Sequence, residues 1–283
     1  MNRLRIAALG ALLLVAAWPA SAQPADPVAR GRYLVESIAG CGNCHTPKGP
    51  QGDLPGMNLA GGQVIDEQPF RAVASNITPD PETGIGRWTE AQIARAIREG
   101  IRPDGRIIGP PMPFELYRGI ADSDLAAMVA YLRSVPAVRN AVPASEYRIP
   151  LPPSYGPPVA SVPDPPANDP VARGAYLAGP VGHCIDCHTP MAAGGQRDWS
   201  RTGLGGQPFN GPWGTSVARN ITPDREHGLG AWTDVQILRA VTQGVSADGR
   251  QLFPPMGYGY YARMTPGDLG DLLAYLRSLR PLR

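Results

Sequence analysis

The chain has few cysteines, few histidines and almost no net charge for its length. Only four of its 283 residues are cysteine and four are histidine, and its formal net charge is +2. The two excess basic residues lie in an N-terminal segment that we expect to be removed, which leaves 24 of the 26 basic residues against 24 acidic ones. Nucleic-acid binding requires a basic surface whose Lys and Arg side chains replace the counterions of the phosphates. Because this chain has no basic excess, we expect no nucleic-acid partner.

Long apolar runs are also missing, with one exception near the N-terminus. Two arginines precede an apolar run from Ile6 to Trp18, and residues 20–22 read Ala-Ser-Ala. A basic start, a short apolar stretch and a small-x-small site are typical of a secretory signal peptide, and the run is too short to span a bilayer. We therefore expect residues 1–22 to be a cleaved signal peptide, the mature protein to be periplasmic, and no transmembrane anchor to remain after cleavage.

All four cysteines fall into two copies of the pattern Cys-x-x-Cys-His. This spacing is typical of c-type haem attachment, in which two thiols bond to the vinyl groups of a haem and the adjoining histidine ligates the iron. Two disulfides or one four-thiolate metal site would also use four cysteines, but neither explains a histidine after each second cysteine. The sequence therefore predicts two covalently attached haem c groups. The residues involved are Cys41, Cys44 and His45 in the first copy and Cys184, Cys187 and His188 in the second.

An internal repeat covers most of the chain. Pro-Val-Ala-Arg-Gly begins at Pro27 and again at Pro170, and the two haem motifs have the same offset. After one extra residue in the second copy, Asn-Ile-Thr-Pro-Asp recurs at positions 76 and 220. A period this long indicates duplicated domains rather than a solenoid. We predict one domain over residues 23–136, a second over residues 169–283, and between them a proline-rich linker over residues 137–168 that is extended and semi-rigid.

Each copy of the repeat is predicted to contain three helices and no strand, so the predicted fold class is all-α. Asp-Pro begins the first helix, Thr-x-x-Gln forms a capping box at the second, glycine ends the second, and an apolar stripe at helical spacing marks the third. The predicted helices cover Val28–Ile38, Thr89–Gly100 and Leu125–Leu132 in the first copy, and Val171–Leu177, Thr233–Gly244 and Leu269–Leu276 in the second.

Few residues remain to bind the other axial position of each iron. His183 directly precedes Cys184 and is predicted to be a solvated turn residue, and His227 lies in a polar loop. Methionine is the other soft ligand, and Met/His ligation raises the potential of a haem. Met112 and Met256 occupy matching positions, each after two prolines that stiffen the backbone, so they are the predicted ligands.

The other methionines have less suitable positions. Met57 follows His45 too closely to reach the far side of a haem easily. Met128 lies on the apolar stripe of the third helix, and Met264 aligns with an ordinary apolar residue, Ile120, so both are predicted to pack in the core.

Several further residue pairs recur in the repeat. Trp88 and Trp232 have two open interpretations, core packing or a contact with a haem propionate. Two Asn-x-Thr pairs are predicted to fix turns, with propionate binding as the alternative. Two glycines are predicted to let the first and third helices cross closely, opposite tyrosines of the third helix. These residues are Asn76, Thr78, Asn220 and Thr222 for the turns, and Gly31 with Tyr131 and Gly174 with Tyr275 for the crossings.

With these motifs identified, each half of the chain resembles a class I cytochrome c domain. The combination of Cys-x-x-Cys-His, Asn-Ile-Thr-Pro-Asp, Gly-x-Trp-Thr, Pro-Pro-Met and Tyr-Leu-Arg-Ser is similar to the cytochrome subunits of periplasmic alcohol, gluconate and related dehydrogenases. The resemblance implies thioether links at the four cysteines, proximal ligands at His45 and His188, and distal ligands at Met112 and Met256. Many such subunits have three haem domains and a membrane-anchoring tail, whereas this sequence shows two haem motifs and no apolar span near its C-terminus.

The resemblance also raises the question of what orients the proximal histidines. Class I domains often use a proline carbonyl about ten residues downstream of the histidine. Pro55 is in the right place to do this for His45, but no proline lies near that position after His188. For His188, we expect another backbone carbonyl to take this role.

The function expected from these features is electron transfer rather than catalysis. A periplasmic dehydrogenase would be the donor, and a terminal oxidase or a smaller cytochrome the acceptor. Irons with both axial positions occupied leave no site for a substrate. The alternative is a dihaem enzyme of the peroxidase type, which needs one displaceable axial ligand and acid/base residues over that face. Both repeats carry Pro-Pro-Met and neither shows a nearby histidine for peroxide cleavage, which favours electron transfer.

Overall fold

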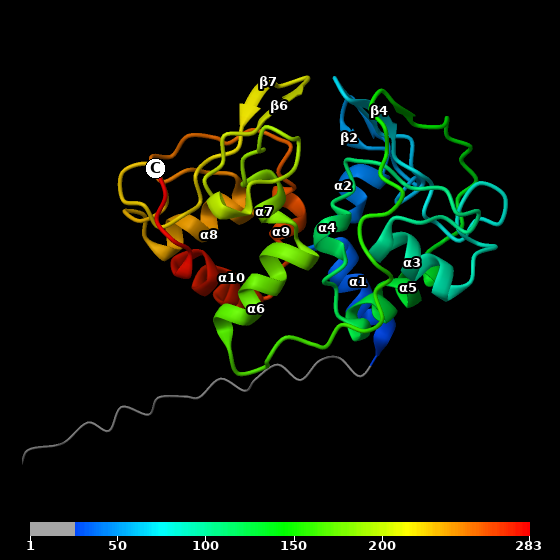
Figure 1. The fold of residues 1–283 in the computed structure, drawn as a ribbon, viewed down its shortest axis with the longest axis horizontal. Helices are drawn as coiled ribbons and strands as arrows, with labels where there is room; N and C mark the ends of the chain where they lie inside the picture. Colours follow the sequence, from blue (N-terminus) through cyan, green and yellow to red (C-terminus); the bar gives the residue numbers. More distant parts are fainter. Residues whose placement is uncertain (1–25) are drawn as a thin grey trace, which may run out of the picture.

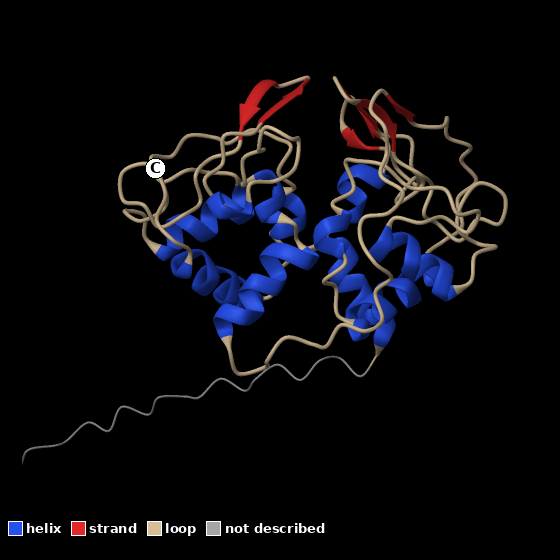
Figure 2. Ribbon diagram, in the orientation of Figure 1, coloured by secondary structure: helices blue, strands red, loops and turns tan. Residues whose placement is uncertain are grey.

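Two helical halves lie side by side, each with short strands at one edge (Figures 1 and 2). The computed structural model describes residues 26–283, so the predicted signal peptide lies outside the described residues. In this article the first half is residues 26–136 and the second half is residues 169–283. Within residues 26–283, no helix combines the length and the apolar character that a membrane crossing requires.

Both halves have the same order of helices. The first contains α1 (Pro27–Glu36), α2 (Cys41–His45), α3 (Glu90–Glu99), α4 (Phe114–Tyr117) and α5 (Asp122–Ser134). The second contains α6 (Pro170–Tyr176), a π-helical turn η1 (Leu177–Val181), α7 (Cys184–Cys187), a 3-10 turn η2 (Trp199–Arg201), α8 (Asp234–Gln243), α9 (Tyr258–Tyr261) and α10 (Pro266–Ser278). The three helices predicted in each copy are present, and four shorter ones accompany them.

Local capping explains why the predicted helices begin and end where they do. The side chains of Asp26 and Asp169 accept hydrogen bonds from the first turns of α1 and α6, each of which has proline in its first turn. Complete capping boxes open α3 at Thr89 and α8 at Thr233. Both of these helices end at a glycine in the left-handed conformation.

The prediction that no strands form is wrong. Short antiparallel hairpins pair β3 (Val64–Glu67) with β4 (Phe70–Val73) and β6 (Pro208–Gly211) with β7 (Gly214–Val217). A smaller hairpin pairs β1 (Lys48–Gly49) with β2 (Gly52–Asp53). None of these strands exceeds four residues, and those rich in Gly, Pro, Asp or Glu lack the apolar alternation that reveals a strand in a sequence. The described fold is therefore mainly helical with minor strands.

The first and third helices of each half cross at a glycine. A Cβ atom on Gly31 would lie 1.9 Å from the carbonyl oxygen of Ala127, and one on Gly174 would lie 1.9 Å from that of Asp271. No side chain fits in either place, so the close crossing predicted for α1 with α5 and for α6 with α10 is confirmed. The same glycines also lie against Cβ of Tyr131 and Tyr275, as expected.

Residues 137–168 follow the surface of the first half. β5 (Glu146–Tyr147) pairs with β4 and completes a sheet of order β3-β4-β5. Further on, the hydroxyl of Tyr155 donates to the carbonyl of Ile108 at 2.9 Å, and its ring lies 4.9 Å from that of Phe114. The backbone N–H of Asp122 donates to the carbonyl of Val162 at 2.9 Å. This segment therefore packs on the loop before α4 and on the start of α5.

Candidate haem-attachment sites

The two Cys-x-x-Cys-His motifs form short helices with the same local geometry. α2 holds Cys41, Cys44 and His45, and α7 holds Cys184 and Cys187, with His188 as its C-terminal cap. A residue in the left-handed conformation precedes each helix, Gly40 with φ 54° and His183 with φ 43°. In both halves the chain enters the attachment helix through this left-handed residue.

The four thiols are free and mostly enclosed by protein. Burial raises the pKa of Cys41 to about 12 and that of Cys184 to about 11. No disulfide joins them, and within residues 26–283 no three His, Cys, Asp or Glu side chains gather as a metal site would require. The disulfide and four-thiolate interpretations are therefore unsupported, whereas a pair of adjacent free thiols beside a histidine is the donor set that haem c requires.

Both motif histidines are oriented by a backbone carbonyl. Nδ1 of His45 lies 2.7 Å from the carbonyl oxygen of Ser75, and Nδ1 of His188 lies 2.7 Å from that of Arg219. A carbonyl oxygen only accepts hydrogen bonds, so Nδ1 carries the proton and Nε2 keeps its lone pair. Burial lowers the pKa of both imidazoles, which keeps them neutral. Each histidine is thus prepared as a metal ligand with its partner carbonyl already in place.

The interpretation of Pro55 as the residue that orients His45 is wrong. The carbonyl that accepts from His45 belongs to Ser75, 30 residues downstream, and the matching carbonyl of Arg219 serves His188. The expectation that a non-proline carbonyl orients His188 is confirmed. Each of these residues directly precedes a repeated Asn-Ile-Thr-Pro-Asp motif, but the motif alone does not show that the preceding carbonyl reaches the histidine.

The Asn-Ile-Thr motif holds these carbonyls in position. Asn76 accepts from the backbone N–H of Thr78 through Oδ1 and donates to the carbonyl of Val138 through Nδ2 at 2.7 Å. In the second half, Asn220 accepts from Thr222 in the same way and donates to the carbonyl of Leu282 at 2.7 Å. The predicted turn-fixing role of these residues is therefore confirmed, and each turn is tied to the segment that follows α5 or α10.

The two candidate distal ligands lie in matching loops that lead into α4 and α9. Met112 and Met256 are half-buried, and their carbonyls accept from the backbone N–H groups of Phe114 and Tyr258 at 3.0 and 3.1 Å. A pair of prolines precedes each methionine, with a cis bond between the two prolines in both copies. Two other methionines, Met128 and Met264, are buried in the core as predicted.

The structure corrects one prediction about the remaining histidines and confirms the other. His183 is not a solvated turn residue: it is half-buried between the halves, with its ring 5.8 Å from that of Tyr117 at an interplanar angle of 70°. Burial lowers the pKa of its imidazole. His227 is an exposed loop residue beside Asp224, as expected.

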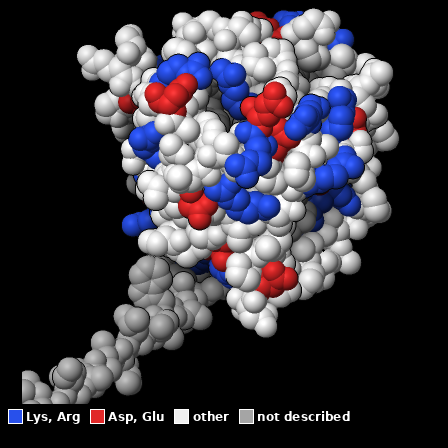
Figure 3. All heavy atoms as spheres, turned by 90° about the vertical axis from the view of Figure 1, so that its left-hand side faces the viewer, with Lys and Arg blue, Asp and Glu red and all other residues white. Residues whose placement is uncertain are grey.

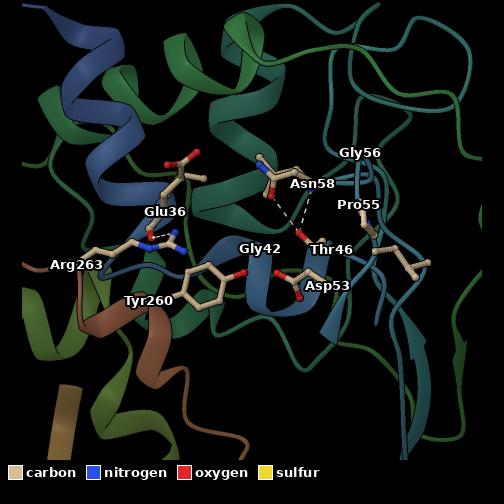
Figure 4. A pocket seen from close by; sticks show the side chains of 12 residues that line it. Glu36, Gly42, Thr46, Asp53, Pro55, Gly56, Asn58, Tyr260 and Arg263 are labelled. Atoms are coloured by element: carbon tan, nitrogen blue, oxygen red, sulfur yellow. Dashed lines mark hydrogen bonds between the residues drawn. The ribbon is translucent and has the colours of Figure 1, made fainter. Parts of the chain in front are cut away.

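A polar cavity of about 290 Å³ lies beside the attachment helix α2 (Figure 4). The first half lines it with Glu36, Thr46 and Asp53, and the second half with Tyr260 and Arg263. Figure 4 shows Tyr260 and Asp53 pointing toward Gly42 of α2 from opposite sides. Neither motif histidine nor any methionine lines the cavity, so it is separate from the candidate ligands.

Comparison with known proteins identifies the family. The cytochrome c family model matches residues 28–136. The chain is also 30% identical to a dihaem cytochrome c-type protein of Cereibacter sphaeroides, over 74% of this chain and 71% of that protein. The chain belongs to the cytochrome c family. Since its residues fit haem c at both motifs, this cytochrome holds two haem c groups, as the sequence predicted.

Two larger relatives carry the names of dehydrogenase subunits. The cytochrome is 31% identical to the fructose dehydrogenase cytochrome subunit of Gluconobacter japonicus, over 96% of its own length and 58% of that protein. It is 33% identical to the cytochrome c subunit of the alcohol dehydrogenase (quinone) of Gluconobacter oxydans, over 85% of its length and 52% of that protein. The predicted resemblance to such subunits is confirmed, and the chain spans about half the length of each.

The surface charge of the cytochrome differs slightly between the halves. The first half has 11 basic and 13 acidic residues when counted from residue 23, and the second half has 11 and 9. Figure 3 shows a face of the second half on which arginines lie among fewer acidic side chains. Several arginines of the second half are paired with acidic side chains; Arg283, for example, contacts Asp224 at 3.1 Å.

Proposed function

We propose that this cytochrome is a periplasmic electron carrier built from two tandem class I cytochrome c-like domains, residues 23–136 and 169–283. It accepts electrons from a dehydrogenase and delivers them to a terminal oxidase or a smaller cytochrome. The observation that carries this proposal is the repeated site: both halves contain a thiol pair, an oriented neutral histidine and a methionine loop of the same design. Two like sites favour a relay over an enzyme in which one iron must differ.

Each residue of the site has a defined task in this proposal. Cys41 and Cys44 anchor one haem and Cys184 and Cys187 the other, while His45 and His188 ligate the irons through Nε2. Met112 and Met256 supply the distal sulfur ligands. Haem c supplies a one-electron Fe(III)/Fe(II) couple, and thioether ligation raises its potential. Side chains bound on both sides of each iron would leave no position there for a substrate.

The proposed partners and location rest on the relatives and on the N-terminal sequence. Two relatives are named as cytochrome subunits of fructose and alcohol dehydrogenases, so we assign a dehydrogenase as donor and an association with it as a subunit. The segment of residues 1–22 has the pattern of a signal peptide, which supports the periplasm as the compartment. A nucleic-acid partner has no support, because the predicted mature chain has no basic excess.

Axial ligation is the property that tests this function. We expect the oxidised protein to show a far-red methionine-to-iron charge-transfer band with the intensity of two haems, and the reduced protein to resist carbon monoxide. Met112→Ala and Met256→Ala should each remove about half of the band and lower one midpoint potential, since each removes one thioether ligand. Met128→Leu and Met264→Leu are matched controls in the core and should leave the spectrum unchanged.

Two results would contradict the proposal. An alanine variant that keeps the full band and both potentials would show that the loop methionine is not a ligand. Rapid binding of carbon monoxide to one haem of the reduced wild-type protein would favour the peroxidase-type enzyme, because that mechanism requires an open or displaceable axial position.

A further inference from the structure

The two halves meet in a seam whose contacts are reciprocal. η1 of the second half packs on α4 of the first, so closely that a Cβ on Gly119 would lie 2.8 Å from the ring of Pro180. In return, α2 packs on the second half: the Asn43 side chain donates to the carbonyl of Pro255 at 3.3 Å. Each attachment segment therefore contacts the region around the methionine loop of the opposite half, through α4 on η1 and through Pro255 on α2.

Apolar side chains at matching positions of α1 and the α6–η1 segment are buried, and among them Ile38 lies against Gly182 across the seam. The repeat aligns Leu34, Val35 and Ile38 with Leu177, Ala178 and Val181, and all six are at most 3% exposed. They belong to one continuous hydrophobic cluster that includes residues of both halves. The two halves therefore share one apolar core, whereas the polar cavity lined by Glu36 and Arg263 occupies another part of their boundary.

Two tyrosines at matching positions cross the seam and bind the opposite half. The hydroxyl of Tyr33 donates to Asp268 at 2.5 Å and accepts from the backbone N–H of Thr265 at 3.1 Å. The hydroxyl of Tyr176 donates to Asp124 at 2.8 Å and accepts from the backbone N–H of Ala121 at 3.2 Å. Each tyrosine thereby uses both its donor and an acceptor on the first turn of the opposite third helix.

The aspartates that receive these tyrosines are themselves held by arginines of their own half. Arg30 binds Asp124 through two hydrogen bonds of 2.8 and 2.9 Å, and Arg173 contacts Asp268 at 3.3 Å. Asp124 is 2% exposed and Asp268 is 6% exposed, so water does not compete strongly for either carboxylate. We call the groups Tyr176–Asp124–Arg30 and Tyr33–Asp268–Arg173 the two clamps.

A second pair of tyrosines at matching positions, Tyr117 and Tyr261, lies near the haem-attachment cysteines. Tyr117 is 6% exposed and lies near Cys41 and Cys44 of its own half, and its ring lies 5.8 Å from that of His183 of the other half. The matching Tyr261 lies near the thiols of Cys184 and Cys187 and also near Cys44 across the seam. Burial raises the pKa of both tyrosine hydroxyls well above the ordinary value, so both hydroxyls stay protonated at physiological pH.

From these contacts we propose that the two clamps fix the arrangement of the two halves, and with it the positions of the attachment helices α2 and α7, and that this arrangement sets electron exchange between the two irons. The proposal rests on the function proposed above and names the residues that position the two redox sites. In one exchange, a single electron leaves one Fe(II), which becomes Fe(III), and reduces the other Fe(III) to Fe(II). No proton moves, because the tyrosines remain protonated throughout.

The test separates exchange within the molecule from reduction by an outside reagent. Tyr33→Phe, Tyr176→Phe and the double variant remove the clamp hydroxyls but keep the rings in the seam. Each hydroxyl binds a buried carboxylate of the opposite half. Its loss should therefore lower, by roughly tenfold or more, the ratio of molecules whose halves are packed together to molecules whose halves have separated. Tyr155→Phe is the matched control, since its hydroxyl binds the carbonyl of Ile108 without crossing the seam.

Three measurements on the full-length dihaem protein decide the outcome. After rapid one-electron reduction, the rate of equilibration between the haems should fall in the double variant and stay at the wild-type value in Tyr155→Phe. Small-angle X-ray scattering should show a larger radius of gyration for the double variant. The two midpoint potentials should move closer together, because separated haems interact less strongly.

The possible outcomes distinguish this inference from the proposed function. If the double variant retains the wild-type exchange rate and radius of gyration while both haems keep their methionine band, the clamps do not position the haems and the inference is overturned. If the variant fails to fold, Asp268→Asn provides the second test, because it removes the carboxylate charge at one clamp only. Loss of the methionine band in the wild-type protein would refute the proposed function instead.

Discussion

The two halves share a sequence pattern but differ in what covers their methionine loops. In the first half, residues 146–162 lie over the loop before α4, with Tyr147 against Gly109 and Tyr155 against Phe114. Within residues 26–283 no corresponding segment covers the loop of the second half, and Phe253, which replaces Gly109, is 60% exposed. Duplicated motifs thus give similar haem sites with unequal access, and the second half offers the more open approach to its methionine loop.

The presence of Gly109 in the first half and Phe253 in the second accounts for part of the difference in how the two methionine loops are covered. A Cβ on Gly109 would lie 2.3 Å from the ring of Tyr147, so no side chain fits while the linker is in place. In the second half Tyr258 replaces Phe114, and its hydroxyl donates to the carbonyl of Phe253 at 3.1 Å. The second loop is therefore braced within its own half, whereas the first is braced by the linker.

The largest expected effect comes from substituting the glycine at which the first and third helices cross, a feature that both halves have. Gly31→Ala and Gly174→Ala place a Cβ 1.9 Å from a backbone carbonyl oxygen, so α1 or α6 must move away from its crossing partner. We expect a loss of about 1–3 kcal/mol or more in the free energy of unfolding for either variant. Thermal unfolding monitored by circular dichroism measures this effect.

A matched glycine serves as the control for these variants. Gly259 has no neighbour within 4 Å of an added Cβ, so Gly259→Ala should be tolerated. Equal destabilisation by the two crossing variants would show that the halves are equivalent in their helical framework. A crossing variant with unchanged stability would show that the crossing is looser than the distances indicate.

The next largest effect is expected from a substitution that disturbs the linker covering the first half. Gly109→Phe introduces the residue of the second half at a position where Tyr147 leaves no room, so we expect the linker to detach locally. The cost should be about 1–3 kcal/mol, as for other overpacked sites. Limited proteolysis should then cleave within residues 140–160 much faster than in the wild type. The reverse change, Phe253→Gly, should leave linker cleavage unaffected; equal cleavage of all three proteins would contradict the comparison.

The smallest effect on stability is expected from a substitution in the second half. Its main consequence should be slower electron exchange with a partner protein. Phe253→Ser removes an exposed aromatic ring beside the methionine loop and should change stability by less than about 0.5 kcal/mol. Because exposed aromatic side chains contribute strongly to interfaces, we expect slower electron exchange with an external protein partner, without slower exchange between the two haems. Stopped-flow mixing with a reduced soluble cytochrome measures the former. An unchanged rate would show that partners do not approach this loop.

Features that depend on neighbouring residues were predictable. The haem motifs, the capping boxes at Thr89 and Thr233 and the proline entries of α1 and α6 are set by side chains a few residues apart, so the sequence revealed them. The repeat added the matching positions of Met112 and Met256. The hairpins were missed because their strands are only two to four residues long and lack an alternating apolar pattern.

Features that depend on distant partners could not be predicted. The carbonyl that orients His45 comes from 30 residues downstream, and Tyr33 reaches Asp268 across 235 positions of the chain. His183 was assigned to solvent because nothing in its local sequence reveals that Tyr117 packs against it. Such contacts exist only once segments far apart in the chain have packed together.

The sequence alone determined that this chain carries two haem c sites, two sets of caps and helices, and a duplicated arrangement, because covalent attachment and helix capping act over a few residues. The tertiary structure alone decided which carbonyls orient the histidines, which half the linker covers and how the attachment helices face each other. The physical reason is that burial removes water from Asp124, Asp268 and Tyr117 together. Only then do hydrogen bonds between residues far apart in the chain become strong enough to select one arrangement.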